Sequence, residues 1–290
     1  MTGLEIIRPG PLSLIEDLGR PGLASSGVGR SGAADRGSFL QANRVLGNPD
    51  NAAAIECTLG GLNVRALSDL DLVITGAPAP AKVDRVPIDH GVPFPLTTGQ
   101  ELRLGVPKTG LRSYLAVRGG LDVPAVLGSR STDTLSGLGP APLAAGDQLA
   151  IGRWTEQSVA DPLPTNKPPA SGPVTLRVVL GPRDDWFVRP TDLLDGEWLV
   201  SPNSNRVGIR LDRPEPAADQ PALGRRDDTE LPSEGVVLGS IQVPPSGQPV
   251  LFLADHPVTG GYPVLAVVRG ADVDRAAQAR PGQRLRFALE

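Results

Sequence analysis

An internal repeat constrains what this chain can fold into more than any other feature of its sequence. Residues 59–64 (LGGLNV) match residues 238–243 (LGSIQV), and residues 115–123 (LAVRGGLDV) match residues 265–273 (LAVVRGADV). A third match, between AGDQL and PGQRL, follows in the same order at residues 145–149 and 281–285. One such match can arise by chance, whereas an ordered series indicates an internal repeat. The sequence therefore predicts two tandem units of similar topology.

Turn residues are frequent in both halves and separate short apolar runs. The 290 residues include 35 Gly and 31 Pro, which is typical of many short strands joined by tight turns. The clearest helix pattern covers residues 35–46, with Asp35 as its N-cap and Phe39, Ala42 and Leu46 on one face. Each half has enough strands to close into a barrel, and closure removes exposed sheet edges. We predict an all-β fold of two tandem β-barrel lobes with a few short helices.

The boundary between the two halves is predicted from composition. Residues 161–173 (DPLPTNKPPASGP) are rich in proline and polar residues and show no apolar period, which is typical of a linker. We therefore expect an N-terminal lobe at residues 1–160 and a C-terminal lobe at residues 174–290.

Several classes of function are disfavoured by composition. The net charge of −4, without a stripe of Lys and Arg, argues against a nucleic-acid partner. One cysteine, Cys57, and two histidines, His90 and His256, leave no disulfide framework and no multi-cysteine or histidine-rich metal centre, so we predict no metal site. The first residues resemble no signal peptide, and no apolar run reaches the ~20 residues of a membrane span. We expect a soluble, cytoplasmic protein that does not bind a membrane.

Polar residues gather at the breaks between the short strands of residues 231–263. They are Ser233, Glu234, Gln242, Gln248, Asp255, His256, Thr259 and Tyr262. For any one of them alone, a role in a turn is the simpler interpretation. As a set, together with Asn205 and Arg206 upstream, they predict a site at strand ends, where the mouth of a barrel can surround a small ligand.

Two further loops are candidates for binding an anion. Residues 128–134 (GSRSTDT) can bind a carboxylate or phosphate through Arg130, and a solvated turn is an equally good interpretation. Residues 27–32 (GVGRSG) are rich in glycine but fit neither the dinucleotide-binding nor the Walker pattern. We interpret this second run as an irregular loop first and as an anion-contacting loop second.

Motifs along nearly the whole chain resemble one known family. The runs that carry the resemblance are EDLGRPG at 16–22, SGAAD at 31–35, LAVRGG at 115–120, LGSRST at 127–132, SNRVG at 204–208, SEG at 233–235, GSIQVP at 239–244 and TGGYP at 259–263. In these runs the chain is similar to the C subunit of bacterial 5-oxoprolinase, a family also known as allophanate hydrolase subunit 2 and as the antagonist of a sporulation-kinase inhibitor. It also resembles one half of the carboxyltransferase domain of urea carboxylase.

The resemblance implies cyclophilin-like lobes and an obligate assembly. It implies a homologous, smaller B subunit as partner, which resembles allophanate hydrolase subunit 1, and for oxoprolinase a further A subunit. It also implies that the complex uses ATP and that no cofactor is bound covalently. One departure stands out, because His256, Pro257 and Val258 replace the family's expected Arg-Gln-Thr before residues 259–263. This change beside the presumed pocket bears on the choice of substrate.

The first functional hypothesis is ATP-dependent opening of the 5-oxoproline lactam to glutamate by the complex. The chemistry needs donors for phosphate and carboxylate, and a base or a group that positions water. Arg206, Arg130 and Gln242 suit the donor role, and Glu234 or Asp255 suits the base. Asn205, Thr259 and Tyr262 complete the set as substrate-binding residues. We expect Arg206→Ala to abolish turnover while leaving the fold intact.

Two alternatives stay open. One is a biotin-dependent carboxyltransferase lobe acting on urea or a related amide, with the biotin carried by another chain. The other is a non-catalytic regulator that sequesters the B subunit. In each case we place the site on the second lobe, because the first has Thr75, Gly76 and Ala77 where the second has Ala254, Asp255 and His256.

Overall fold

The computed structural model of this protein describes residues 3–153, 172–214, 223–226 and 229–290. Contacts divide the chain into two compact units, the first formed by residues 1–20 and 31–168 and the second by residues 21–30 and 169–290. Most of the predicted linker at 161–173 lies outside the described residues, so the predicted lobe boundaries stay a prediction. The division shows that a short N-terminal segment groups with the C-terminal unit.

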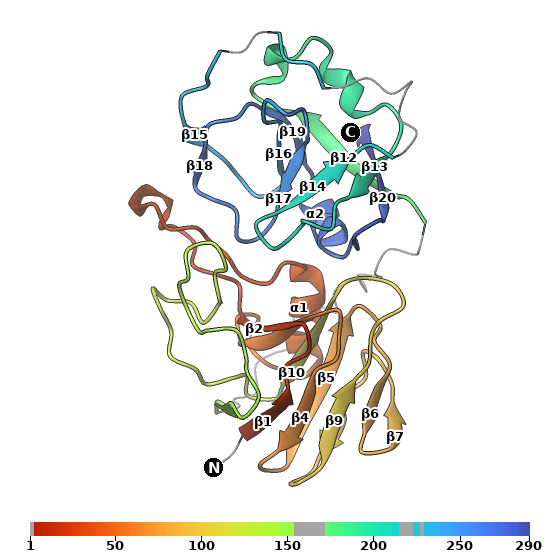
Figure 1. Ribbon diagram of the computed structural model, residues 1–290. Coiled ribbons are helices and arrows are strands. Elements are labelled where there is room, and N and C mark those ends of the chain that lie inside the picture. Colours follow the sequence, from red (N-terminus) through yellow and green to blue (C-terminus); the bar gives the residue numbers. More distant parts are fainter. Residues whose placement is uncertain (1–2, 154–171, 215–222, 227–228) are drawn as a thin grey trace. The chain divides into compact units, whose positions relative to one another are not determined.

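The described part of the first unit contains two sheets (Figure 1). The six-stranded sheet has the order β11 (Gln148–Ala150), β1 (Gly3–Arg8), β4 (Asn63–Ala66), β9 (Glu101–Leu104), β6 (Ala81–Val83) and β7 (Val86–Ile88). The five-stranded sheet has the order β2 (Leu12–Glu16), β3 (Ala54–Thr58), β10 (Arg112–Val117), β5 (Leu70–Gly76) and β8 (Phe94–Leu96). The first unit therefore shows two sheets in place of the closed barrel that we predicted.

A continuous apolar core lies between these two sheets. It joins Ile6 and Val64 of the first sheet to Ile55, Ile74 and Leu115 of the second, and each is at most 3% exposed. The alternation expected of a half-buried strand is visible in β4, where valine and alanine are buried and the intervening polar residues are half-buried. Burial of alternate side chains from both sheets is what holds the unit together.

Helix α1 (Arg36–Val45) covers the other face of the five-stranded sheet, against β5 and β10. Asp35 caps its start by accepting hydrogen bonds from the Ser38 backbone N–H (3.0 Å) and hydroxyl (2.7 Å). Phe39 and Ala42 are fully buried, and the Phe39 ring meets the Tyr114 ring edge to face at 6.2 Å. The predicted helix, its cap and its buried face are confirmed.

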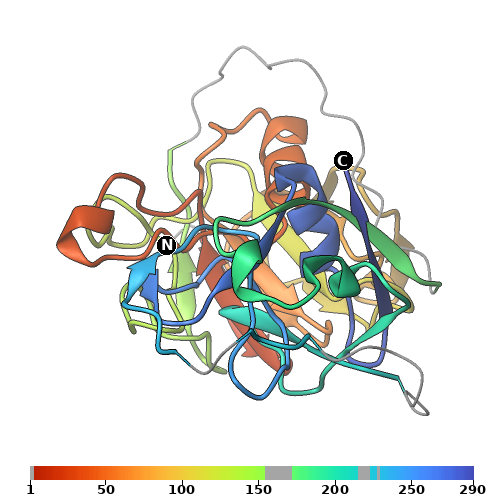
Figure 2. The ribbon, with the colours of Figure 1, turned by 90° about the horizontal axis from the view of Figure 1, so that it is seen from above.

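The second unit is built on a closed barrel of seven strands, which are coloured from green to blue in Figure 2. Their order is β12 (Val174–Leu180), β19 (Val264–Val268), β16 (Ser240–Gln242), β17 (Val250–Phe252), β14 (Gly208–Asp212), β13 (Trp198–Val200) and β20 (Arg284–Leu289). The parallel pair of β12 and β20 closes the ring, and helix α2 (Gly270–Ala277) packs on β12. A separate two-stranded ribbon is formed by β15 (Glu234–Gly235) and β18 (Thr259–Gly260). Three short 3₁₀ turns complete the described elements: η1 (Ala24–Ser26), η2 (Asp184–Trp186) and η3 (Pro190–Leu193).

The matched runs of the repeat do not occupy equivalent strands. In the first unit, β5 and β10 pair with each other, and β4 lies in the other sheet between β1 and β9. In the second unit, the corresponding strands β17 and β19 flank β16 and are not neighbours. The prediction of similar topology is therefore wrong at the level of strand pairing.

What the repeat preserves is local turn geometry. Gly60 and Gly239 both have positive φ, at 70° and 85°. A Cβ on Gly60 would lie 1.9 Å from the Gly105 carbonyl oxygen, so only glycine fits there. Gly146 and Gly282 also share positive φ, at 92° and 82°, in the turns that lead into β11 and β20. The short sequence matches between the two halves thus reflect similar turn conformations and do not reflect the same pairing of strands.

Candidate functional site

The ribbon of β15 and β18 brings predicted site residues together in the second unit. In its register Glu234 lies opposite Gly260, and Gly235 lies opposite Thr259. Arg183, next to η2, binds the Glu234 carboxylate with both Nε (3.1 Å) and Nη2. Hydrogen bonding from Arg183 lowers the pKa of Glu234, so this carboxylate is ionised at neutral pH and is a weak base while the pair is intact. Both side chains are about one third exposed, which leaves the pair within reach of a ligand.

Gln242 holds the turn that follows β18. Its side chain is 4% exposed, and its Nε2 donates a hydrogen bond to the Tyr262 carbonyl oxygen at 2.9 Å. A Cβ on Gly260 would lie 2.4 Å from the Gln242 Nε2, so only glycine at position 260 leaves room for the Gln242 side-chain amide. The Tyr262 side chain is 47% exposed, and Thr259 is exposed as well. Gln242 therefore positions the turn from the buried side, and the two exposed residues supply hydroxyl groups at the surface.

Arg206 and Asp255 bind each other. The Arg206 Nε and Nη2 donate to Oδ2 and Oδ1 of Asp255 at 2.9 and 3.0 Å, and the two side chains are 2% and 0% exposed. The backbone N–H of Asp255 also donates to the Arg206 carbonyl oxygen. This bidentate pair fixes the loop before β14 to the loop after β17. A group that touched substrate would have to give up one side of this pair, so the geometry is that of a buried brace.

The remaining predicted residues also have partners within their own loops. The Asn205 Oδ1 accepts hydrogen bonds from the backbone N–H groups of Val207 (2.9 Å) and Gly208 (3.2 Å), which forms a tight turn. Arg130 belongs to the first unit, where its Nε donates to the Val123 carbonyl oxygen at 2.8 Å. Their roles in substrate binding stay predictions.

The residues that depart from the family pattern, His256, Pro257 and Val258, lie in a packed turn. The His256 Nδ1 lies 2.7 Å from the Pro257 carbonyl oxygen, and the imidazole is 6.0 Å from the Phe252 ring. This neighbourhood gives His256 a packing role at the end of β17. The turn interpretation of His256 fits these contacts.

Three of the family motifs meet in a buried polar network of the first unit. Asp17 accepts hydrogen bonds from the hydroxyls of Ser129 and Ser131, both at 2.6 Å, and from the backbone N–H groups of Gly19 and Arg130, both at 2.7 Å. The Ala33 backbone N–H donates in turn to the Asp17 carbonyl oxygen at 2.9 Å. Residues 16–22, 31–35 and 127–132 are thus joined at one residue, Asp17, through its buried carboxylate and its backbone carbonyl oxygen.

A second buried carboxylate extends this network under α1. Glu56 accepts hydrogen bonds from the Tyr114 hydroxyl (2.8 Å) and the Ala34 backbone N–H (2.9 Å), and Arg112 lies 3.3 Å away. The Tyr114 oxygen accepts from the Asp35 backbone N–H, and burial, reinforced by the nearby carboxylates, raises the pKa of Tyr114 well above its usual range. Sequence reasoning treated the first unit as a scaffold and missed this network.

Two places in the first unit where a nucleotide phosphate could be expected, the Gly32 end of the glycine-rich run and the start of α1, are already filled. A Cβ on Gly32 would lie 2.9 Å from the Gly19 backbone nitrogen, so that end of the glycine-rich run is packed against main chain. The N-terminus of α1 is capped by the Asp35 carboxylate, which opposes an anion there. The residues present therefore do not fit an ATP phosphate site at either place, and we derive no step through one.

Neither a metal cluster nor a membrane-spanning helix is found in the part of the chain that the structure describes. Within it, no three His, Cys, Asp or Glu side chains lie close enough to hold a metal ion. No helix among the same residues is long and apolar enough to cross a bilayer.

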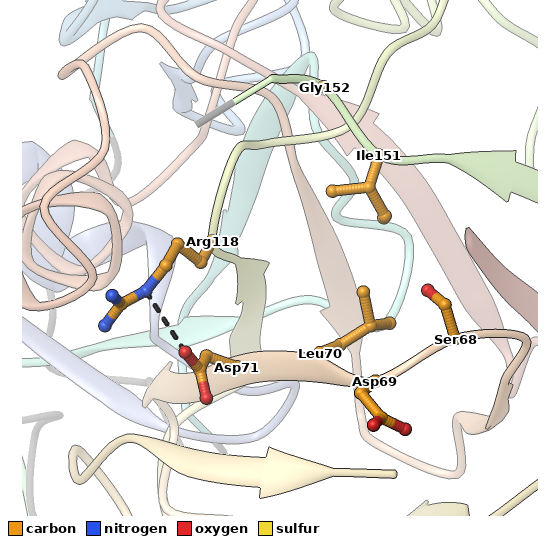
Figure 3. A pocket seen from close by; sticks show the side chains of 7 residues that line it. All are labelled: Ser68, Asp69, Leu70, Asp71, Arg118, Ile151 and Gly152. Carbon is orange, nitrogen blue, oxygen red and sulfur yellow. Dashed lines mark ion pairs between the residues drawn. The ribbon is translucent and has the colours of Figure 1, made fainter. Parts of the chain in front are cut away.

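The first unit also has a surface pocket with a volume of about 240 Å³ (Figure 3). Its lining residues are Ser68, Asp69, Leu70, Asp71, Arg118, Ile151 and Gly152. Arg118 belongs to the LAVRGG motif at residues 115–120, and sequence reasoning assigned no role to it. The pocket is distinct from the ribbon, since all of its residues belong to the other unit.

Comparison with known proteins identifies the family. A family model described as the carboxyltransferase domain, subdomain A and B, matches residues 26–289. The chain belongs to this family. The match covers the described strands from β3 to β20 and nearly the whole of both units.

Relatives of this carboxyltransferase-domain protein include C subunits of 5-oxoprolinase and urea amidolyases. It is 38% identical to the C subunit of 5-oxoprolinase from Escherichia coli over 98% of this chain and 90% of that protein. It is 34% identical to the C subunit of 5-oxoprolinase from Haemophilus influenzae over 94% of this chain and 86% of that protein. The crystal structure of the K. lactis urea amidolyase matches with a TM-score of 0.88 and 28% identity, over 99% of this chain and 19% of that one.

Proposed function

We propose that this chain is the C subunit of an ATP-dependent 5-oxoprolinase, a complex that opens 5-oxoproline to glutamate. The observation that carries the proposal is the 38% identity to a protein of that name over nearly the full length of both chains. The polar ribbon of the second unit supports it, because it offers a guanidinium, two hydroxyls and a carboxylate around one exposed turn. Such a complex needs a supply of ATP, so the proposal includes a cytoplasmic location.

The reaction explains what the ribbon has to do. A lactam is a poor electrophile, and transfer of phosphate from ATP to its oxygen makes the ring carbon reactive. Water then adds at that carbon and the ring C–N bond breaks. A second water releases phosphate and leaves glutamate. The protein must hold the substrate carboxylate, exclude bulk water and aim one water molecule at the ring carbon.

Arg183 is the residue best placed to hold the substrate carboxylate. Its guanidinium is 36% exposed and is already in a bidentate contact with Glu234, so an incoming carboxylate meets the same fork geometry. Exchange of one carboxylate for the other releases Glu234, whose pKa then rises toward its usual value. Glu234 can thereby accept a proton from the attacking water, with Thr259 and Tyr262 orienting the ring. The pair of Arg206 and Asp255 serves as the buried brace of the same unit.

Partner proteins supply the remaining parts. We propose that the smaller, homologous B subunit meets the ribbon, and that the A subunit contributes to ATP-dependent activation. We further propose that the closed barrel of the second unit is a cyclophilin-like lobe.

The test is turnover by the assembled complex. The chain is expressed with its partner A and B subunits, and ATP hydrolysis that depends on 5-oxoproline is measured. Arg183→Gln should raise the KM for 5-oxoproline about tenfold or more, because a charge-assisted contact to the substrate is lost. Arg286→Gln is the matched control, since this exposed arginine pairs with Glu197 elsewhere on the same unit. A complex with no ATP turnover on 5-oxoproline would overturn the proposal.

A carboxyltransferase function is the second candidate, favoured by the match to urea amidolyase. It predicts carboxyl transfer from carboxybiotin to urea or a related amide and no dependence of ATP turnover on 5-oxoproline. A non-catalytic regulator predicts tight binding to the B subunit that lowers turnover as more of this chain is added. The same reconstituted complex separates all three.

A further inference from the structure

The pocket of the first unit lies at the start of β5 and just after the end of β10, which are neighbouring strands. Asp71 of β5 and Arg118, just after β10, are directly opposite each other, since the Arg118 backbone N–H donates to the Asp71 carbonyl oxygen at 2.9 Å. Their side chains form an ion pair of 3.3 Å and are 48% and 39% exposed. In Figure 3 these two side chains point toward one another at one end of the pocket, and beside them Leu70 and Ile151 face each other. The pocket thus has a charged end and an apolar part.

Ser68 adds a hydrogen-bonding group that the protein itself does not use. Its hydroxyl oxygen is buried and has no hydrogen-bond partner among the described residues. A buried hydroxyl without a partner is unfavourable, so a ligand atom that reaches Ser68 Oγ after a rotation of this side chain supplies the missing hydrogen bond. Ser68 lines the same pocket as the Asp71–Arg118 pair.

The charges around the pocket select among ligands. Asp69 adds a second carboxylate to the pocket lining. The Thr98 backbone N–H (2.8 Å) and hydroxyl (2.9 Å) donate hydrogen bonds to this carboxylate and lower the pKa of Asp69. Two carboxylates against one guanidinium give the lining a net negative charge. A bare anion is therefore disfavoured, and a bare cation would leave the Arg118 guanidinium and the Ser68 hydroxyl without a ligand partner.

We propose that this pocket binds a small α-amino acid with an uncharged side chain. The ligand carboxylate is bound by the Arg118 guanidinium and the Ser68 hydroxyl, and the ammonium group is bound by the Asp71 carboxylate. The apolar side chain of the ligand packs against Leu70 and Ile151. The four charges then alternate in sign around the pocket, which is the arrangement that favours a zwitterion.

The size of the pocket agrees with this class of ligand. Its volume of about 240 Å³ is below the ~300–1,000 Å³ typical of sites for drug-sized molecules. It therefore has room for a molecule of the size of leucine and little more. An amino acid with a second carboxylate, such as glutamate, would bring a net negative charge to a negative lining.

The experiment measures binding to the full chain by isothermal titration calorimetry. The probes are L-leucine, L-glutamate, 4-methylpentanoate, which lacks the ammonium group, and isoamylamine, which lacks the carboxylate. L-leucine should bind saturably, and each of the other three should bind at least about tenfold more weakly, because each loses a charge-assisted contact or meets repulsion. Equal binding of leucine and 4-methylpentanoate, or no binding of leucine, would overturn the proposal.

Variants then test the assigned contacts. Arg118→Gln and Asp71→Asn should each weaken leucine binding about tenfold or more, and Ser68→Ala should weaken it about threefold to tenfold. Arg103→Gln on β9 is the control: it is 62% exposed, pairs with Glu101 outside the pocket and should bind leucine like the wild type. If Arg118→Gln does not fold, Ser68→Ala, whose Oγ carries no hydrogen bond in the described structure, still decides the case. Because binding is measured without partner proteins or turnover, its failure leaves the proposed 5-oxoprolinase role untouched.

Discussion

Each of the two units contains a completely buried aspartate, and the two carboxylates are stabilised in different ways. Asp17 in the first unit receives four hydrogen bonds, from two hydroxyls and two backbone N–H groups. Asp255 in the second unit receives a bidentate contact from one guanidinium. In the first arrangement several groups each supply one short contact to the charge, and in the second, one guanidinium supplies two. The two aspartates should therefore differ in how much is lost when one neighbour is removed.

The largest effect is expected for Arg206→Ala. The substitution leaves the Asp255 carboxylate buried without its guanidinium, which costs about 3–5 kcal/mol of unfolding free energy. The structure thus replaces the expectation of an intact fold with one of strong destabilisation. Denaturant unfolding followed by tryptophan fluorescence measures it, because two of the three tryptophans, Trp186 and Trp198, lie in the second unit.

The paired replacement Arg206→Met with Asp255→Leu provides the control. It removes both charges at similar volume and should recover much of the lost stability. If Arg206→Ala is folded and stable but has no turnover, the structural role is wrong and Arg206 binds substrate directly.

A smaller effect is expected for Ser131→Ala in the first unit. Its hydroxyl donates to the Asp17 carboxylate at 2.6 Å and accepts from the Asp17 backbone N–H at 2.8 Å. A hydrogen bond to a charged group contributes about 1.5–3 kcal/mol, and three donors to the carboxylate remain. Hydrogen exchange of the first unit is the measurement. A loss equal to that of Arg206→Ala would mean that the arrangement with several partners has no advantage.

Asp272 of α2 combines both arrangements and gives a pH-dependent test. Burial acts to raise its pKa, but hydrogen bonds from the Arg177 guanidinium and backbone N–H, and from Arg275, outweigh burial and lower it. A pKa lowered in the folded state stabilises the protein above the unfolded pKa of about 3.9, and this contribution is lost as pH falls through the folded pKa.

We therefore expect Asp272→Asn to be less stable than the wild type by about 1 kcal/mol near pH 7. The difference should shrink as pH falls below about 4. Unfolding free energies of both proteins between about pH 7 and pH 2.5 test this. A difference that does not change with pH would show that the carboxylate charge has no part in it.

The smallest effect on stability is expected for Glu234→Gln. Its pair with Arg183 is about one third exposed, and solvent screening makes the net contribution of such a pair to stability small. Turnover of the assembled complex should nevertheless fall, because the variant cannot accept a proton. Unfolding free energy and kcat measured on the same preparation check both parts. Unchanged kcat would remove Glu234 from the proposed chemistry.

Local features of the fold were predictable from the sequence, and strand pairing was not. The cap at Asp35 and the buried face with Phe39 and Ala42 depend on residues within one helix, so a short pattern carries them. The neighbours of β4 and β16 depend on segments far away in the chain, and two similar runs ended in different sheets. The repeat signal came from glycine turns, which can be shared by units with different strand orders.

The candidate site was predictable in part for a related reason. Glu234, Gln242, Thr259 and Tyr262 meet at one ribbon because their segments contact one another directly. Arg183 was missed, since it lies 51 residues before its partner in an ordinary turn. Arg206 and Asp255 were predicted to face a ligand, whereas they face each other. A sequence shows which side chains are polar but does not show which of them bury one another.

The assignment of residues 21–30 to the second unit has a consequence for synthesis and engineering. The chain passes from one unit to the other three times, near residues 20, 30 and 168. Residues 21–30 are therefore synthesised well before the rest of the second unit. They cannot make their native contacts until the ribosome has also translated the first unit and the remainder of the second. A cut at the predicted linker would give two fragments that each lack native contacts. Co-expression of the two fragments, with reassembly into a complex, is the expected way to recover the protein from such a split.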